Sequence, residues 1–351
     1  MRDKVLAFLQ QEIDQHHIPG AVIHISHQQE VILQEAIGNR VVYPKKELMK
    51  LNTIFDLASL TKVVVTLPSI LLLVEAGKLH LDDKVSHFLP DFAKHDKTSI
   101  TIKDLLTHSS GLPAHREYFK ESLNTDEIME RIFNEKLVVG TSERVIYSDL
   151  GFILLYKIIE KVTEEDFQTF LKRELFDKLQ MNETSFLPKY ERERFAATEY
   201  SNALQDYKHG IVHDDNTESM GGVSGHAGLF STIFDLANYA SMIENNGVFK
   251  GRRILSGQSI RLTRQNYTAF SSEYRGLGWV LKSPTLSSCG DLFSHSSYGH
   301  TGFTGTSIWF DPSFQLHVIL LTNRVHFGRK DPILRLRPRL HNLIKAQMER
   351  G

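Results

Sequence analysis

Patterns typical of β-strands lie at both ends of this chain, and a long run of short helical patterns separates them. Near the first end, two apolar segments at 20–26 and 30–38 flank a polar turn. Strand character returns near the other end, at 278–281, 298–302, 306–310 and 315–322. Such segments can bury their apolar faces together by joining one sheet. The sequence therefore predicts a mixed α/β protein of the α+β type. Both ends of the chain would contribute strands to one sheet.

The middle of the chain is predicted to be a mostly helical insertion beside this sheet. Its short helical patterns lie at 101–106, 126–133, 148–162 and 165–179. Residues 200–228 are rich in Gly, His, Asp and Asn and lack apolar periodicity, which predicts a long functional or disordered loop. We therefore expect residues 81–225 to form the insertion with its active-site loop, and residues 1–80 and 226–351 to form the sheet domain. The two parts together would form one catalytic unit.

The composition excludes several classes of function. The 351 residues include 41 basic and 42 acidic side chains, and this balance offers no overall field that would attract nucleic acid or an anionic membrane. The partner is expected to be a small molecule. Cys289 is the only cysteine, so an intrachain disulfide is excluded. The sequence shows neither a secretory signal pattern nor an apolar stretch long enough to span a bilayer, so we expect a cytoplasmic protein.

The segment Ser59-Leu-Thr-Lys62 is the strongest indication of chemistry. A serine at the start of a helix and a lysine one turn later lie on the same face, so the lysine can serve as the proton acceptor of a serine nucleophile. The apolar run at 63–74 would anchor this helix in a core. The pattern alone is also compatible with an ordinary capped helix that carries a surface lysine.

Two further segments offer partners for such a nucleophile. Tyr147 and Asp149 lie at the start of the predicted helix 148–162, and a tyrosine beside a lysine can act as a base or proton shuttle because the cation favours its ionised form. His300 and Thr301 lie on a predicted strand, where they could bind a substrate carboxylate or relay protons. Each segment also has a purely structural interpretation. The segment of Tyr147 and Asp149 could be a helix cap preceded by a buried tyrosine, and His300 could be a strand histidine with satisfied hydrogen bonds.

Taken together and in this order, the three segments resemble the motifs of the serine penicillin-recognising enzymes. The chain is similar to class C β-lactamases and D-alanyl-D-alanine carboxypeptidases over nearly its whole length. Further segments at 105–112, 225–231 and 299–306 fit the same family in order. The resemblance implies a β-lactamase-like fold, with an antiparallel sheet flanked by N- and C-terminal helices, and a hydrolase that acts on a peptide, amide, ester or β-lactam.

The resemblance also implies roles for individual residues. Ser59 would be acylated, and Lys62 and Tyr147 would move protons during acylation and deacylation. Asp149 would occupy the position at which the family usually has an asparagine. Substrate would be oriented by the strand residues His300, Thr301 and Gly302, and the oxyanion would be bound by the backbone N–H groups of Ser59 and Phe303. No cofactor and no metal are expected for this chemistry.

Two of these positions depart from the family pattern. Asp149 replaces a neutral amide, and His300 replaces the lysine that is typical of true β-lactamases. A histidine there is more similar to carboxypeptidases, D-aminopeptidases and related esterases. Both changes weaken the attraction for a β-lactam carboxylate, so we expect a peptide, amide or ester substrate rather than efficient antibiotic hydrolysis.

A narrower resemblance concerns a subgroup linked to muramyl-peptide cleavage in cell-wall recycling, and it rests on the segments at 145–155, 212–216 and 320–326. It implies that His213, Asp214 and Asp215 reach the cleft from the long loop. The alternative for these residues is a solvated polar loop.

Two other functions stay open at this level. One is a metal-dependent hydrolase that would use His213, Asp214, His226 and His300 as ligands. The other is a non-catalytic sensor that keeps the fold, because Asp149 could impair turnover.

Overall fold

The computed structural model describes residues 1–285 and 287–349, and a seven-stranded antiparallel sheet lies in this part of the chain. Its strand order is β10-β11-β12-β13-β1-β2-β3. Strands from the two ends of the chain are therefore neighbours, and Ala21 of β1 lies opposite Thr322 of β13. The strands are β1 (Gly20–His27), β2 (Glu30–Val41), β3 (Glu47–Leu48), β10 (Val280–Leu281), β11 (Tyr298–Thr301), β12 (Ser307–Asp311) and β13 (Leu316–Thr322).

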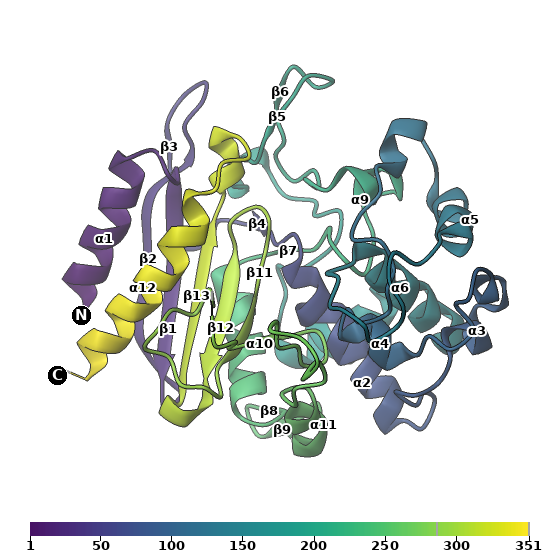
Figure 1. Ribbon diagram of the computed structural model, residues 1–351. Coiled ribbons are helices and arrows are strands. Elements are labelled where there is room, and N and C mark those ends of the chain that lie inside the picture. Colours follow the sequence, from purple (N-terminus) through teal and green to yellow (C-terminus); the bar gives the residue numbers. More distant parts are fainter. Residues whose placement is uncertain (286, 350–351) are drawn as a thin grey trace.

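Helices α1 (Arg2–Asp14) and α12 (Pro332–Met348) lie side by side on one face of this sheet (Figure 1). Successive side chains of a strand point to opposite faces. Accordingly, Ala21 and Ile23 belong to the core under α1 and α12, whereas Val22 belongs to the core on the other face. Helices cover both faces, so nearly every residue of β1 and β13 is buried.

The other helices lie on the opposite face of the sheet and extend away from it (Figure 1). Helix α10 contacts β1 and β13, while α6 packs against α2 and α4 deeper in the helical part. A single large apolar core joins these helices to the sheet. The helices are α2 (Leu67–Glu75), α3 (Val85–Phe88), α4 (Ile102–Leu106), α5 (Thr125–Asn134), α6 (Asp149–Thr163), α7 (Phe167–Leu171), α8 (Asp177–Leu179), α9 (Asp215–Ser219), α10 (Ile233–Glu244) and α11 (Gly257–Leu262).

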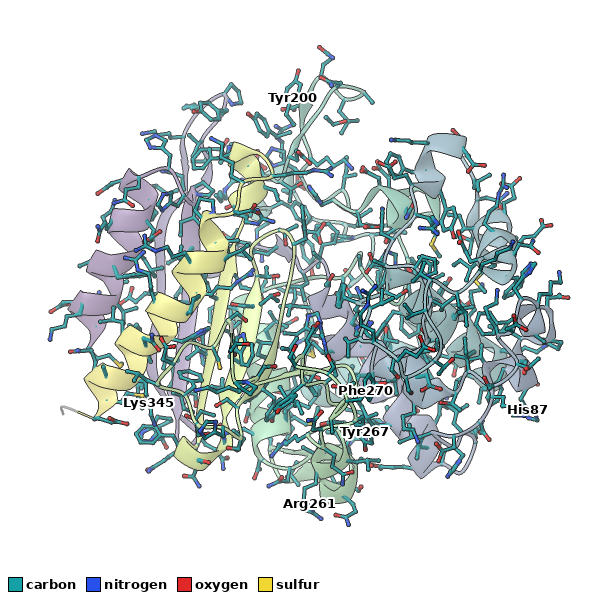
Figure 2. All side chains as sticks on the ribbon, viewed as in Figure 1. His87, Tyr200, Arg261, Tyr267, Phe270 and Lys345 are labelled. Atoms are coloured by element: carbon teal, nitrogen blue, oxygen red, sulfur yellow. The ribbon has the colours of Figure 1, made fainter. Side chains whose placement is uncertain are left out.

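Short strand pairs complete the described part of the chain. The hairpin of β5 and β6 projects from the body of the molecule, with Tyr200 exposed on it (Figure 2). The pairs are β4 (Phe55–Asp56) with β7 (Phe230–Ser231), β5 (Tyr200–Ser201) with β6 (Asp206–Tyr207), and β8 (Val248–Phe249) with β9 (Arg252–Arg253). No helix within residues 1–285 and 287–349 combines the length and the apolar character needed to cross a bilayer.

The predicted fold class is confirmed, and two local predictions need correction. The single helix expected at 165–179 is divided into α7, a π-helical turn at Lys172–Phe176, and α8. The loop expected at 200–228 contains the β5–β6 hairpin and α9. Its polar side chains form hydrogen bonds within the protein, and Asp214 caps α9 by accepting from Thr217 N at 2.7 Å. Apolar periodicity therefore could not reveal these elements, because capping and turn bonds stabilise them.

Candidate active site

Ser59 lies in the turn after β4, where two cavities of about 380 and 310 Å³ meet. The helix expected to start at Ser59 starts one residue later, and a π-helical turn at Lys62–Thr66 follows its first two residues and leads into α2. The preceding residue, Ala58, has a φ of 47°, which side-chain-bearing residues rarely adopt. Strained residues and π-helical turns are frequent at functional sites. The local backbone thus presents the Ser59 hydroxyl to both cavities.

Lys62 is fully buried beneath this serine. Its Nζ donates to Ser59 Oγ at 3.2 Å, to Asp149 Oδ1 at 2.7 Å, and to the carbonyl oxygen of His226 at 3.0 Å. An ammonium group has three donors, so each of them has a partner here. The structure therefore brings Ser59, Lys62 and Asp149 together, and the interpretation of Lys62 as a surface lysine is wrong.

Charge is balanced within this group. Burial alone would lower the pKa of Lys62, but Asp149 and Tyr147 raise it above its ordinary value. Burial alone would raise the pKa of Asp149, but Lys62 and His115 lower it below its ordinary value. Lys62 is thus a cation and Asp149 an anion near neutral pH. In this state Lys62 is a donor to Ser59, so it stabilises negative charge on Oγ and another group must take the serine proton.

Tyr147 lines both cavities together with Ser59. Its ring centre lies 4.9 Å from Lys62 Nζ, and Arg275 approaches the same ring with its guanidinium carbon at 5.4 Å. His108 supports the ring from behind, with ring centres 4.5 Å apart. Two cations around the phenol would favour negative charge on its oxygen.

His300 lies on β11 and is buried, and its ring centre is 6.0 Å from that of Tyr147. Its Nδ1 donates to the carbonyl oxygen of Thr301 at 3.0 Å. Burial, together with Arg275 and Lys62, lowers the pKa of His300 well below its ordinary value. His300 is therefore neutral and offers an unshared electron pair on Nε2, for which the described residues supply no hydrogen-bond partner. It can accept a hydrogen bond, but it does not provide the positive charge of a lysine.

Gly302 allows β11 to approach the serine turn closely. A Cβ at Gly302 would lie 2.2 Å from Thr306 Oγ1 and 2.5 Å from the carbonyl oxygen of Leu57. Thr304 and Thr306 donate from their hydroxyls to the carbonyl oxygens of Asp56 and Leu57, at 2.8 and 3.0 Å. These contacts hold the segment after β11 against the turn that carries Ser59.

This contact places two free N–H groups beside the serine. Among the described residues, neither Ser59 N nor Phe303 N has a hydrogen-bond acceptor. Both residues line both cavities. The arrangement is suited to an oxyanion hole, in which two backbone donors bind the oxygen of a tetrahedral intermediate.

The long loop reaches the larger cavity, as the sequence predicted for His213, Asp214 and Asp215. Asp214 accepts from His226 Nε2 at 3.0 Å, and His226 Nδ1 is bonded to Ser224 Oγ at 2.8 Å. His213 is bonded through Nε2 to Glu199 at 2.9 Å and packs its ring on Phe303. These side chains are engaged with the protein, so the interpretation as a solvated polar loop is wrong.

The four ligands of the metal alternative do not converge. His226 is bonded to Asp214 and lines the larger cavity, whereas His300 lines the smaller one. Within residues 1–285 and 287–349, no three His, Cys, Asp or Glu side chains are placed to bind one metal ion.

Several residues of the site were not identified from the sequence, among them His108, His115 and Arg275. His108 lies in a segment that fits the family pattern, and its Nδ1 accepts from Ser148 N at 3.0 Å. His115 Nδ1 lies 3.4 Å from Asp149 Oδ2, and this carboxylate raises the pKa of His115 despite partial burial. Arg275 belongs to no predicted motif, and only the folded chain places it beside Tyr147.

Known proteins are similar to this chain in sequence and in fold. The chain matches the family described as Beta-lactamase over residues 5–342. It is 32% identical to the N-acetylmuramyl-L-alanine amidase of Bacillus subtilis (strain 168), in a match that covers 90% of this chain and 79% of that protein. It is 29% identical to an Escherichia coli (strain K12) protein that carries the provisional name D-alanyl-D-alanine carboxypeptidase, with 93% and 82% covered.

Solved structures show the same fold. EstCE1, a hydrolase with promiscuous acyltransferase activity, superimposes with a TM-score of 0.79 at 21% identity and covers 98% of both chains. A class C β-lactamase mutant, in which a tyrosine is replaced by phenylalanine, gives a TM-score of 0.77 at 20% identity, with 97% of both chains covered. The family match spans nearly the whole chain, and the fold is consistent with it. This protein belongs to the β-lactamase family and is a serine hydrolase of that family.

Proposed function

We propose that this enzyme hydrolyses the amide bond between an N-acetylmuramyl group and the first amino acid of a small muramyl peptide, through an acyl-enzyme on Ser59. The observation that carries the chemistry is the buried ammonium of Lys62, hydrogen-bonded to Ser59 Oγ at the meeting of two cavities. The substrate class is supported by the 32% identity to the B. subtilis amidase.

Acylation begins when Ser59 Oγ attacks the amide carbonyl carbon. The N–H groups of Ser59 and Phe303 bind the oxyanion that forms. Tyr147 takes the serine proton as it gives its own proton to the amide nitrogen, and the carbon–nitrogen bond breaks. The amine leaves, and the acyl group stays on Ser59 as an ester. Lys62 stabilises the negative charge that develops on the serine and tyrosine oxygens during this relay.

Deacylation uses the same relay in reverse. A water molecule attacks the ester carbonyl, Tyr147 takes a proton from that water, and Ser59 Oγ regains a proton as it leaves. The products are a free carboxylic acid and the amine released earlier. His300 is neutral, so its Nε2 can accept a hydrogen bond from bound substrate without a change of charge.

The larger cavity suits a polar acyl group. Its lining combines apolar and polar side chains, with the donors and acceptors His115, His213, Asp214 and Arg329. A sugar derivative presents many hydroxyl and amide groups, which such a lining can bind.

Product analysis tests this function. Purified protein is incubated with N-acetylmuramyl-L-alanine and with a peptide that ends in D-alanyl-D-alanine, and free amino acids are separated and quantified. Release of L-alanine from the first substrate, absent with Ser59→Ala, supports the amidase. Release of D-alanine from the second alone would instead identify a carboxypeptidase. Absence of a covalent fluorophosphonate adduct in the intact-mass spectrum would contradict the serine mechanism itself.

A double variant tests the coupling between Lys62 and Tyr147. If both act in one relay, Lys62→Met combined with Tyr147→Phe lowers kcat/KM little more than the more damaging single change. The three variants are compared by steady-state kinetics on one amide substrate. Losses that multiply in full would show that the two residues act independently.

We also propose that the enzyme works in the cytoplasm, where recycled muramyl peptides would be its substrates. Cell fractionation with antibody detection tests this location. Recovery in an extracytoplasmic fraction would contradict it.

A further inference from the structure

A third cavity, of about 440 Å³, is rich in aromatic side chains, and we call it the aromatic cavity. Phe, Tyr and Trp make up 10% of the whole sequence but four of the ten residues that line this cavity, and two histidines add further rings. The six rings belong to His16, Tyr43, Tyr200, Tyr207, His326 and Phe327. Among the described residues, none that lines this cavity also lines either cavity beside Ser59. The aromatic cavity is therefore a separate site.

The buried ring of His326 holds the walls of this cavity together. Its Nε2 accepts from the backbone N–H groups of Val42 and Tyr43, at 2.9 and 3.2 Å, so the proton is on Nδ1, which donates to the carbonyl oxygen of Thr198 at 3.2 Å. Burial lowers the pKa of His326 to about 4, so the ring is neutral near pH 7. The histidine thus joins three segments that are distant in the sequence, and the cavity is formed without a ligand.

The rings around His326 keep part of their surface open to solvent. Tyr207 packs on His326 with ring centres 4.4 Å apart, and the ring centre of Tyr43 lies 5.9 Å from that of His326. Tyr43 and Tyr200 are nevertheless 48% and 45% exposed, and Figure 2 shows Tyr200 on the projecting β5–β6 hairpin. Exposed apolar surface that gathers in one place marks a binding site.

The charged groups of this lining favour an uncharged ligand. The lining contains one carboxylate, Glu199, and one ammonium, Lys330. Glu199 is already bonded to His213 at 2.9 Å and to Arg329 at 3.0 Å. A cationic ligand would meet Lys330 without a free carboxylate, and an anionic ligand would meet Glu199. Neither sign of charge is therefore selected.

A neutral saccharide has the chemistry that this lining can bind. The C–H bonds of a pyranose ring form apolar patches on its faces, and these pack on aromatic faces, which carry partial negative charge. The hydroxyl groups at the edge of the sugar need polar partners, and the phenol hydroxyls of Tyr43, Tyr200 and Tyr207 can donate and accept. The volume is that of a typical small-molecule site.

We propose that the aromatic cavity is a second, non-catalytic site that binds a neutral saccharide. This inference goes beyond the proposed function and does not depend on the amidase reaction. Glu199 connects the two sites, because it lines the aromatic cavity and is bonded to His213 in the wall of the larger cavity. A saccharide bound here would therefore lie beside the cavity proposed for the acyl group.

Isothermal titration calorimetry with triacetylchitotriose tests this site, since this neutral saccharide lacks the lactyl group of a muramyl sugar. We expect Tyr43→Ala and Tyr200→Ala each to raise Kd by about fivefold to tenfold, as for the loss of one aromatic contact. Tyr43→Phe keeps the ring and should retain most of the affinity. Both tyrosines are exposed, so the variants should fold, and thermal unfolding checks this.

Tyr190 provides a matched control, because it is an exposed tyrosine that lines none of these three cavities. Tyr190→Ala should keep the wild-type Kd. A wild type that does not bind the saccharide at millimolar concentration would overturn the proposal. Equal Kd values in all variants would also overturn it, because the saccharide would then occupy another site such as the larger cavity.

Two further ligands separate the saccharide from other occupants of an aromatic cavity. Choline represents an organic cation, and decaproline represents a peptide that packs on aromatic grooves. We expect neither to bind at concentrations at which the saccharide does. Binding of choline or decaproline without binding of the saccharide would reject the proposal. The readout is binding rather than turnover, so failure of the amidase function leaves this result unchanged.

Discussion

Ser59→Ala is expected to lower turnover by about 10⁴-fold or more, because Ser59 Oγ accepts from Lys62 at the point where both cavities meet and is the nucleophile of the proposed reaction. Removal of Oγ also removes the atom that carries the acyl group. Labelling by a fluorophosphonate should therefore disappear in intact-mass spectra, together with amide hydrolysis in a coupled assay of amino-acid release.

Ser69 offers a control for this change. It is a buried serine on α2 whose hydroxyl donates to the carbonyl oxygen of Val65 at 2.7 Å, outside both cavities. Ser69→Ala should keep labelling and turnover near wild-type values. Hydrolysis and labelling that persist in Ser59→Ala would assign the nucleophile to another residue.

Lys62→Met is expected to lower both activity and stability. One donor to the reacting oxygens is lost, which costs about 10²- to 10³-fold in kcat. The change also leaves the Asp149 carboxylate without its main partner. Loss of one member of this buried pair should lower the free energy of unfolding by about 3 kcal/mol, the lower end of the usual range. The lower end applies because the Asp149 side chain is 18% exposed and His115 remains nearby. Denaturant unfolding measures this difference.

Removal of both charges separates the two effects. Lys62→Met combined with Asp149→Leu should recover most of the stability but none of the activity, since an apolar pair of similar size leaves no unpaired charge. Equal stability of the single and double variants would show that the ion pair does not account for the loss.

The loss of stability in Lys62→Met should depend on pH. Lys62 lowers the pKa of Asp149 in the folded protein, so the pair contributes fully above the unfolded carboxyl pKa of about 3.9 and less as the pH falls through the folded value. In Lys62→Met the carboxyl group can take up a proton instead. The stability difference between wild type and variant should therefore shrink on acidification below about pH 4. A difference that stays constant would contradict the charge argument.

Local patterns were sufficient for much of the fold. Strands β12 and β13 and helix α6 lie where periodicity and capping residues predicted them, within a residue or two. The division into 1–80 with 226–351 and 81–225 stays a prediction. Periodicity did not reveal the π-helical turn after Ser59, because local spacing alone does not distinguish it from an α-helix.

The sequence by itself determined which residues are candidates for the reaction, since Ser59, Lys62, Tyr147 and the strand of His300 occur as short motifs that keep their order in the chain. It could not determine their charges. Tertiary structure decided that Lys62 is a buried cation held by Asp149, that His300 is neutral, and that Arg275 brings a guanidinium to the smaller cavity. The physical reason is that pKa values and free donors depend on burial and on neighbours that are distant in the sequence, and folding alone brings these neighbours together.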